Sequence, residues 1–179
     1  MDQLQYIGPL GVPLLILSLV GLATIIERIV FYLRLQKVDS CKIFINIKES
    51  LEQNKNQPKN IRDELATFLL IEAKKPHDFG IRILRLIAVT SPMLGLLGTV
   101  VGIIDSFKKI AFLDGPVYPA LIADGLWTAL ITTEVGLVIA LPCLFAAFIF
   151  ARMGEKRIEI YQTKLNQISL TLEGIKFNI

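Results

Sequence analysis

Three long apolar runs, separated by polar segments, dominate the pattern of the chain. Gln3–Ile26 and Leu86–Ile104 contain no charged residue, and Gly125–Ala151 contains only one, Glu134. At about 1.5 Å per residue, helices of these lengths would reach roughly 36, 28 and 40 Å, close to or above the ~30 Å hydrocarbon thickness of a bilayer. A soluble fold with three buried helices is the alternative, but 179 residues offer too little polar surface to enclose them. The pattern therefore predicts three transmembrane helices.

The polar segments also carry helical periodicity. Ile43, Ile47 and Leu51 recur every four residues, which predicts an amphipathic helix, and a second helix is expected from Ile61 until Pro76 breaks it. After the third apolar run, the tail repeats apolar residues at spacings of three or four, as expected of an amphipathic helix. These residues are Ile158, Tyr161, Leu165, Ile168 and Leu172.

We therefore expect an all-α integral membrane protein with cytoplasmic helical extensions. The expected segments are a first transmembrane helix (1–35), a cytoplasmic helical loop (36–84), a second transmembrane helix (85–107), a short periplasmic loop (108–123), a third transmembrane helix (124–151) and a cytoplasmic amphipathic tail (152–179).

Charge sets the expected orientation. Of the 19 Lys and Arg residues, 17 would lie on one side of the membrane in a three-span chain, and positive residues favour the cytoplasm. The N-terminus is then periplasmic and the C-terminus cytoplasmic. The start of the chain has no basic segment and no cleavage site, so the first helix is expected to remain. A net charge of +3 is too small to indicate nucleic acid binding.

Nothing in the sequence predicts an enzyme, a cofactor or a metal site. The single histidine, His77, follows a proline, and we expect it to be a surface loop residue. Cys41 and Cys143 would lie too far apart for a disulfide and are expected to be reduced thiols.

The second apolar run has one face of small and hydroxylated residues. At 100° per residue this face spans about 100°. Its members are Ser91, Gly95, Gly98, Thr99, Gly102 and Ser106. A Gly-x-x-x-Gly pattern favours tight helix packing, whereas a hydroxylated face could instead line a polar path or receive a partner helix.

The third run carries a similar stripe, so the two small faces are expected to meet. Its members are Gly125, Thr128, Ala129, Thr132, Gly136, Cys143, Ala146 and Ala147. Glu134 lies about 160° from Thr132 on the helical wheel and near the middle of the bilayer, where a charged acid costs roughly 2.5 to 3.5 kcal/mol. It could serve a function there or be a protonated, hydrogen-bonded structural carboxyl.

Two motifs together resemble the ExbB/TolQ family of inner-membrane motor subunits, and an ExbB-like protein most closely. One is Leu-Gly-Leu-Leu-Gly-Thr-Val-x-Gly, ending at Gly102, and the other runs from Ala129 to Pro142. Glu27 and Arg28, at the inner boundary of the first helix, also match. Three spans favour this group over its four-span relative MotA.

The resemblance implies a homo-pentamer in membrane lipid, with a central pore that holds the helices of an ExbD/TolR-like dimer. Proton flow through it would act on a TonB-like or TolA-like protein in the periplasm. Thr99 and Thr133 match pore threonines, and Thr128 stands where many members have a glutamate. Candidate proton-path residues are Thr99, Thr128, Thr132, Thr133 and Glu134, and candidate packing residues are Gly95, Gly98, Gly102, Gly136 and Pro142. A TolQ-type envelope motor and a passive scaffold or channel remain alternatives.

Overall fold

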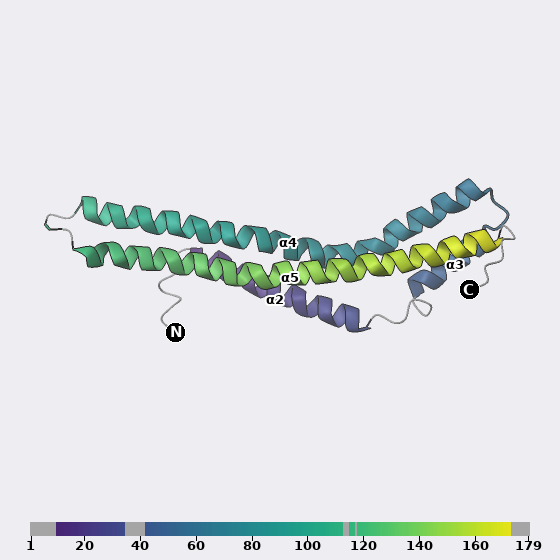
Figure 1. Cartoon of the computed structure of the whole chain (residues 1–179), viewed down its shortest axis with the longest axis horizontal. Coiled ribbons are helices and arrows are strands. Elements are labelled where there is room, and N and C mark those ends of the chain that lie inside the picture. Colours follow the sequence, from purple (N-terminus) through teal and green to yellow (C-terminus); the bar gives the residue numbers. More distant parts are fainter. Residues whose placement is uncertain (1–9, 35–41, 113–114, 117, 173–179) are drawn as a thin grey trace. The chain divides into compact units, whose positions relative to one another are not determined.

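The computed structural model describes residues 10–34, 42–112, 115–116 and 118–172, and its regular structure in these ranges is helical (Figure 1). The helices are α2 (Gly11–Arg34), α3 (Lys42–Gln53), α4 (Lys59–Ala111) and α5 (Pro119–Leu172). Three of them, α2, α4 and α5, are long and apolar enough to cross a membrane. The predicted all-helical fold with three potential membrane spans is therefore confirmed.

Helix α4 is longer than the sequence pattern predicted. Pro76 was expected to end a helix, but α4 continues through Pro76 and Pro92 to Ala111. A proline inside a helix removes one backbone hydrogen bond, and at Pro76 the bond lost is the one to the carbonyl oxygen of Glu72, four residues earlier. At this point α4 is also contacted by Arg28 of α2, which bonds the carbonyl oxygens of Pro76 and His77, as described below. The turn between α4 and α5 is correspondingly shorter than the expected loop, since α5 already begins at Pro119.

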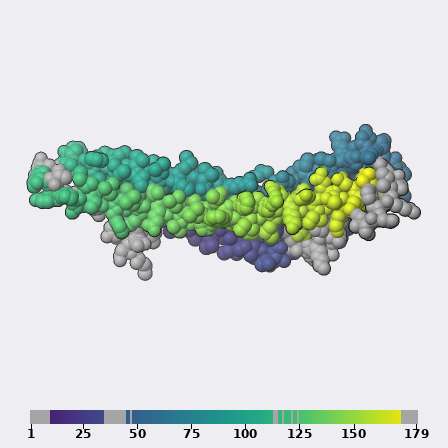
Figure 2. Space-filling model, viewed as in Figure 1, coloured from purple at the N-terminus to yellow at the C-terminus, as the bar shows by residue number. Residues whose placement is uncertain are grey.

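The chain divides into two compact units, and both α4 and α5 contribute to each. The first unit contains α2 up to Glu27 together with Arg82–Ala147. Most of its outward side chains are apolar, and those of Leu86 and Phe145 are each 63% exposed. In Figure 2 the atoms of α4 and α5 in this unit, teal and green, lie against each other. An apolar exterior around a tightly packed interior is what a lipid environment requires.

The second unit contains Arg28–Ile81 and the part of α5 from Phe148 onward. Helix α3 packs there with α4 and α5 around a small core of Leu51, Ala73, Tyr161 and Leu165. The side chains of Ile43 and Ile47 lie outside the described residues, as does Cys41. The amphipathic tail thus continues α5 and buries Tyr161 and Leu165 at 1% exposure each.

Candidate functional site

The small faces of α4 and α5 form a close seam in the first unit, which we call the α4–α5 seam. A Cβ atom added to Gly95 would lie 2.9 Å from the Thr133 Cα, and one added to Gly136 would lie 2.6 Å from the Ser91 carbonyl oxygen. Real Cβ atoms do not approach other atoms this closely. Further along the seam, Gly98 faces Thr132 in the same way. Glycine at these positions therefore permits contact between the two backbones.

The hydroxyl groups of Thr132 and Thr133 form hydrogen bonds at the centre of the seam. Thr133 Oγ1 donates a hydrogen bond to the Gly95 carbonyl oxygen at 2.9 Å, which joins α5 directly to α4. Thr132 is 3% exposed, and its Oγ1 donates to the Ala129 carbonyl in its own helix at 2.7 Å. Both hydroxyl protons are used, so the two oxygens keep only acceptor capacity.

The other candidate residues lie in different surroundings. Thr99 is half-buried, and its Oγ1 donates to the Leu96 carbonyl at 2.6 Å. Thr128 is half-buried as well. Gly102 belongs to the seam, since an added Cβ would lie 2.9 Å from Ala129 Cβ. Pro142 is exposed and lies within α5 without interrupting it.

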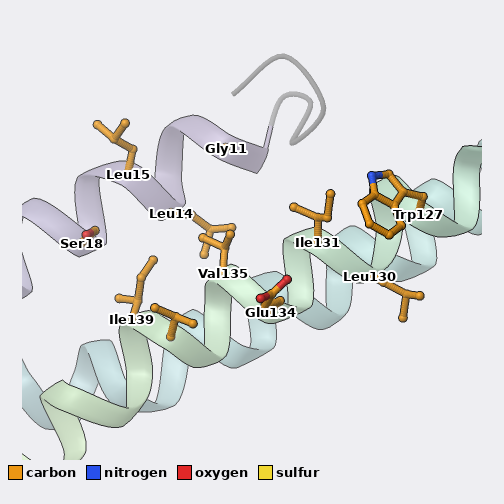
Figure 3. Close-up of a pocket in the computed structure, with 11 residues that line it drawn as sticks. Gly11, Leu14, Leu15, Ser18, Trp127, Leu130, Ile131, Glu134, Val135 and Ile139 are labelled. Atoms are coloured by element: carbon orange, nitrogen blue, oxygen red, sulfur yellow. The ribbon is translucent and has the colours of Figure 1, made fainter. Parts of the chain in front are cut away.

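A groove of about 700 Å³ lies on the other side of α5, between it and α2 (Figure 3). We call it the α2–α5 groove. Most of its lining is aliphatic, with a few groups that can form hydrogen bonds: the Glu134 carboxyl, the Ser18 hydroxyl and the Trp127 indole. Its lining residues are Gly11, Leu14, Leu15, Ser18, Trp127, Leu130, Ile131, Glu134, Val135, Val138 and Ile139. The structure therefore separates Glu134 from the threonines of the seam.

Glu134 has no polar partner among the described residues. Its side chain is exposed, and it forms no hydrogen bond or ion pair with any of them. Ser18, across the groove on α2, is likewise exposed and forms none with the described part of the chain. This arrangement contrasts with the seam, where each threonine hydroxyl donates a hydrogen bond.

A second polar cluster lies in the second unit, around the guanidinium of Arg28. Arg28 is 5% exposed, and its Nη1 donates to the carbonyl oxygens of Pro76 at 2.8 Å and His77 at 3.4 Å. The guanidinium carbon also lies 4.9 Å from the centre of the Phe31 ring. A Cβ at Gly80 would overlap the Arg28 side chain. Arg28 thus contacts the α4 backbone at its proline, while Glu27 is exposed.

Aromatic rings complete this Arg28 cluster and bury the histidine. Tyr32 stacks on Phe150 at 5.4 Å between ring centres and on His77 at 6.0 Å, and its hydroxyl donates to the Phe150 carbonyl at 3.0 Å. His77 is 3% exposed and lies within α4, so the expectation of a surface loop residue is wrong. Burial, with smaller contributions from the charges of Arg157 and Arg28, lowers the pKa of His77 below its usual value, and Asp78 acts weakly in the opposite direction. Burial of His77 therefore favours the neutral form of its ring.

Sequence reasoning did not identify Ser18 or the part of the Arg28 cluster that α4 and α5 contribute. Ser18 lies in a mostly apolar helix, and no pattern of residue spacing in the sequence singles it out. The contacts of Tyr32 with His77 and Phe150 join residues far apart in the chain, so helical periodicity cannot reveal them. Among the described residues, no group of three or more His, Cys, Asp or Glu side chains could hold a metal ion.

Comparison with known proteins adds a family assignment to this geometry. The profile of the MotA/TolQ/ExbB proton channel family matches residues 16–163. This range includes the α4–α5 seam, Glu134 and the Arg28 cluster.

Individual relatives agree with the family match. The chain is 39% identical over 117 residues to biopolymer transport protein exbB1 of Vibrio cholerae, covering 65% of this chain and 51% of the relative. It is 27% identical over 191 residues to the ExbB-like 3 biopolymer transport protein of Synechocystis sp., covering 91% and 90% of the two chains. It is also 36% identical over 89 residues to the Tol-Pal system protein TolQ of Pseudomonas aeruginosa, covering 50% and 38%. The chain thus spans about half the length of the Vibrio cholerae protein.

Proposed function

The chain belongs to the MotA/TolQ/ExbB proton channel family, and on that premise we propose that it is the channel-forming subunit of an ExbB-type motor of the inner membrane. The motor would convert the proton motive force into work on a TonB-like protein that serves outer-membrane transport. The observation that carries the proposal is the family match over residues 16–163, and the α4–α5 seam supplies a structural basis for it.

In this proposal the seam holds α4 and α5 as one rigid pair. Glycines let the backbones touch, and the Thr133 hydrogen bond to Gly95 fixes their register. Five such pairs would surround a central pore in a homo-pentamer, with the helices of an ExbD/TolR-like dimer inside it. The half-buried hydroxyls of Thr99 and Thr128 would be the pore-facing groups, because the Thr132 hydroxyl is enclosed within the seam.

The proposed orientation follows from charge. The N-terminus and the α4–α5 turn would face the periplasm, and α3, the adjoining part of α4 and the end of α5 would lie in the cytoplasm. The Arg28 cluster would then sit at the cytoplasmic boundary, where it ties α2 to α4 just outside the bilayer.

A TolQ-type motor for envelope maintenance is the second candidate. The similarity to TolQ of Pseudomonas aeruginosa supports it over half of this chain. The two candidates differ in their partner, TolR and TolA in one case and ExbD and TonB in the other. Isolation of the tagged protein from its own cells, followed by identification of the copurified single-span protein, decides between them.

Proton flux into vesicles tests the motor itself. We expect the complex reconstituted with its single-span partner to conduct protons, and Thr99→Val to lower this flux while the complex still assembles, because valine keeps the shape and removes the hydroxyl. Val101→Thr, which changes an exposed residue of the same helix, is the matched control. A complex that assembles fully but conducts no protons would support a passive scaffold instead.

A further inference from the structure

The geometry points to a proton-sensitive switch in the Arg28 cluster, in which uptake of a proton by His77 releases Arg28 from the α4 backbone and slows the motor. This inference rests on the proposed function and its orientation, which put the cluster on the cytoplasmic side of the membrane. The switch reduces proton entry when the cytoplasm becomes acidic. All of its groups lie in the second unit of the chain.

The surroundings of the His77 ring suit its neutral form. The ring is 3% exposed, stacks on Tyr32 at 6.0 Å and packs edge-to-face with Phe31 at 5.4 Å. The Tyr32 hydroxyl donates to the Phe150 carbonyl oxygen, and the His77 Nδ1 is buried without a hydrogen bond to the described residues. A charged imidazole carries a proton on both nitrogens, so protonation leaves a buried N–H donor without an acceptor. The closed cluster therefore opposes proton uptake.

Charged groups act on His77 from α2, α4 and α5. Arg28 belongs to α2 and Arg157 to α5, while Asp78 follows His77 in α4. Burial has the largest effect and lowers the pKa of His77, the charges of Arg157 and Arg28 lower it further, and the opposing effect of Asp78 is smaller. A third positive charge beside two cations and one acid is unfavourable. A protonated His77 therefore repels both guanidinium groups.

Arg28 transmits this repulsion to α2. Its Nη1 donates to the carbonyl oxygens of Pro76 at 2.8 Å and of His77 at 3.4 Å, so the guanidinium is bonded to the backbone of the residue that takes up the proton. Gly80 leaves room for the Arg28 side chain on α4, since an added Cβ would overlap it. A guanidinium cannot lose its proton to relieve the repulsion, so relief requires movement. Movement of Arg28 breaks these two hydrogen bonds between α2 and α4.

Proton uptake therefore shifts the cluster from a closed to an open form. In the open form the ring meets water and has the ordinary histidine pKa near 6.5, which lies above the pKa in the closed form. Between these two pKa values the open form binds one more proton, so each fall of one pH unit raises the ratio of open to closed cluster about tenfold. Above about pH 6.5 both forms are unprotonated and the ratio is constant. The cluster is therefore closed at neutral pH and opens on acidification.

Titration of His77 and opening of the cluster can be measured on the same assembled complex in lipid vesicles. His77 is the only histidine in the chain, so isotope-labelled histidine in this chain, without a histidine tag, gives one imidazole signal by NMR. Spin labels at the exposed positions Leu33→Cys on α2 and Lys74→Cys on α4, in a cysteine-free background diluted with unlabelled chains, report the distance between the helices. We expect this distance to broaden toward longer values over the pH range in which the imidazole signal shifts. A control pair within α4, Glu64→Cys and Lys74→Cys, should not change.

Proton flux tests the effect on the motor. A potassium diffusion potential drives the flux at equal pH on both sides, which keeps the driving force constant. We expect the flux of the parent complex to fall several-fold between about pH 7.5 and about pH 5.5, and that of His77→Gln to fall less, because glutamine takes up no proton. Phe31→Leu is the matched control: it removes a ring that contacts His77 and Arg28 but keeps the titrating group, so it should retain the loss on acidification.

The results separate this inference from the proposed function. An imidazole signal that does not shift before the protein unfolds, an unchanged distance while His77 titrates, or parallel flux profiles in the parent and His77→Gln would each overturn the switch and leave the motor proposal standing. If His77→Gln does not assemble, the NMR and distance measurements on the parent chain decide. Absence of flux in the parent complex at every pH would instead reject the motor proposal, whatever the distance measurement shows.

Discussion

Thr133 and Gly95 lie 38 residues apart in the chain, and one hydrogen bond from the Thr133 hydroxyl to the Gly95 carbonyl joins them at 2.9 Å. The bond is possible because Gly95 has no side chain: a Cβ there would lie 2.9 Å from the Thr133 Cα. A small residue and a hydroxyl thus act together, one allowing the approach and the other fixing the register of α4 against α5.

Thr133→Val should weaken this contact without changing its shape. Hydrogen bonds between membrane helices contribute about 0.6 kcal/mol on average and up to about 1.7 kcal/mol, so we expect a loss in that range. Unfolding of the purified protein in mixed micelles measures it. Thr24→Val is the matched control, because the Thr24 hydroxyl bonds only within its own helix, to Val20. Equal losses in the two variants would contradict a special role for the bond between helices.

Gly98→Leu should separate α4 from α5 and disrupt the assembled oligomer. A Cβ at Gly98 already overlaps Thr132, and a full leucine side chain should cost about 1 to 3 kcal/mol or more. Size-exclusion chromatography with light scattering measures the oligomer. Gly115→Leu is the control, since among the described residues beyond its chain neighbours no atom lies within 4 Å of a Cβ at Gly115. An intact oligomer of unchanged stability in Gly98→Leu would show that the seam is not required.

The sequence predicted the helical class and the three potential spans because long uncharged runs leave a chain few other options. The sequence also predicted that small residues share one face of each of two helices, because helical periodicity alone shows which residues lie on the same face. The direction of Glu134 relative to α2 could not be predicted, because no pattern in an almost uniformly apolar helix fixes how α2 packs. Pro76 misled the helix prediction, because a helix that packs against distant segments can continue through a proline, and Arg28, 48 residues earlier in the chain, contacts α4 at this point.

Membrane orientation gives a third prediction. In a background in which Cys41 and Cys143 are replaced by serine and alanine, a membrane-impermeant maleimide should label Gln57→Cys only from the cytoplasmic side and Gly115→Cys only from the periplasmic side. Both residues are exposed in the structure. Labelling in inside-out and right-side-out vesicles distinguishes the two sides. Labelling of the two variants from the opposite sides would contradict the proposed action of the protein on a periplasmic partner.

The Arg28 cluster should make stability depend on pH through His77. An unfolded histidine titrates near pH 6.5, and burial lowers the pKa of His77 in the folded protein. Between those two pKa values the unfolded chain binds more protons, so the free energy of unfolding should fall as the pH drops through about 6.5 and level off below the folded pKa. Above about 6.5 His77 should add no pH dependence.

His77→Gln tests this directly, because His77 is the only histidine in the chain. We expect the parent protein to lose thermal stability between about pH 7.5 and about pH 5.5, and the variant to lose less over the same interval because glutamine binds no proton. The comparison uses the difference in slope, since the loss of stacking on Tyr32 lowers the stability of His77→Gln equally at every pH. Glutamine also leaves the Arg28 hydrogen bonds to the backbone carbonyls intact, as these do not involve the imidazole. Parallel pH profiles for the two proteins would mean that His77 takes up its proton as readily in the folded chain as in the unfolded one.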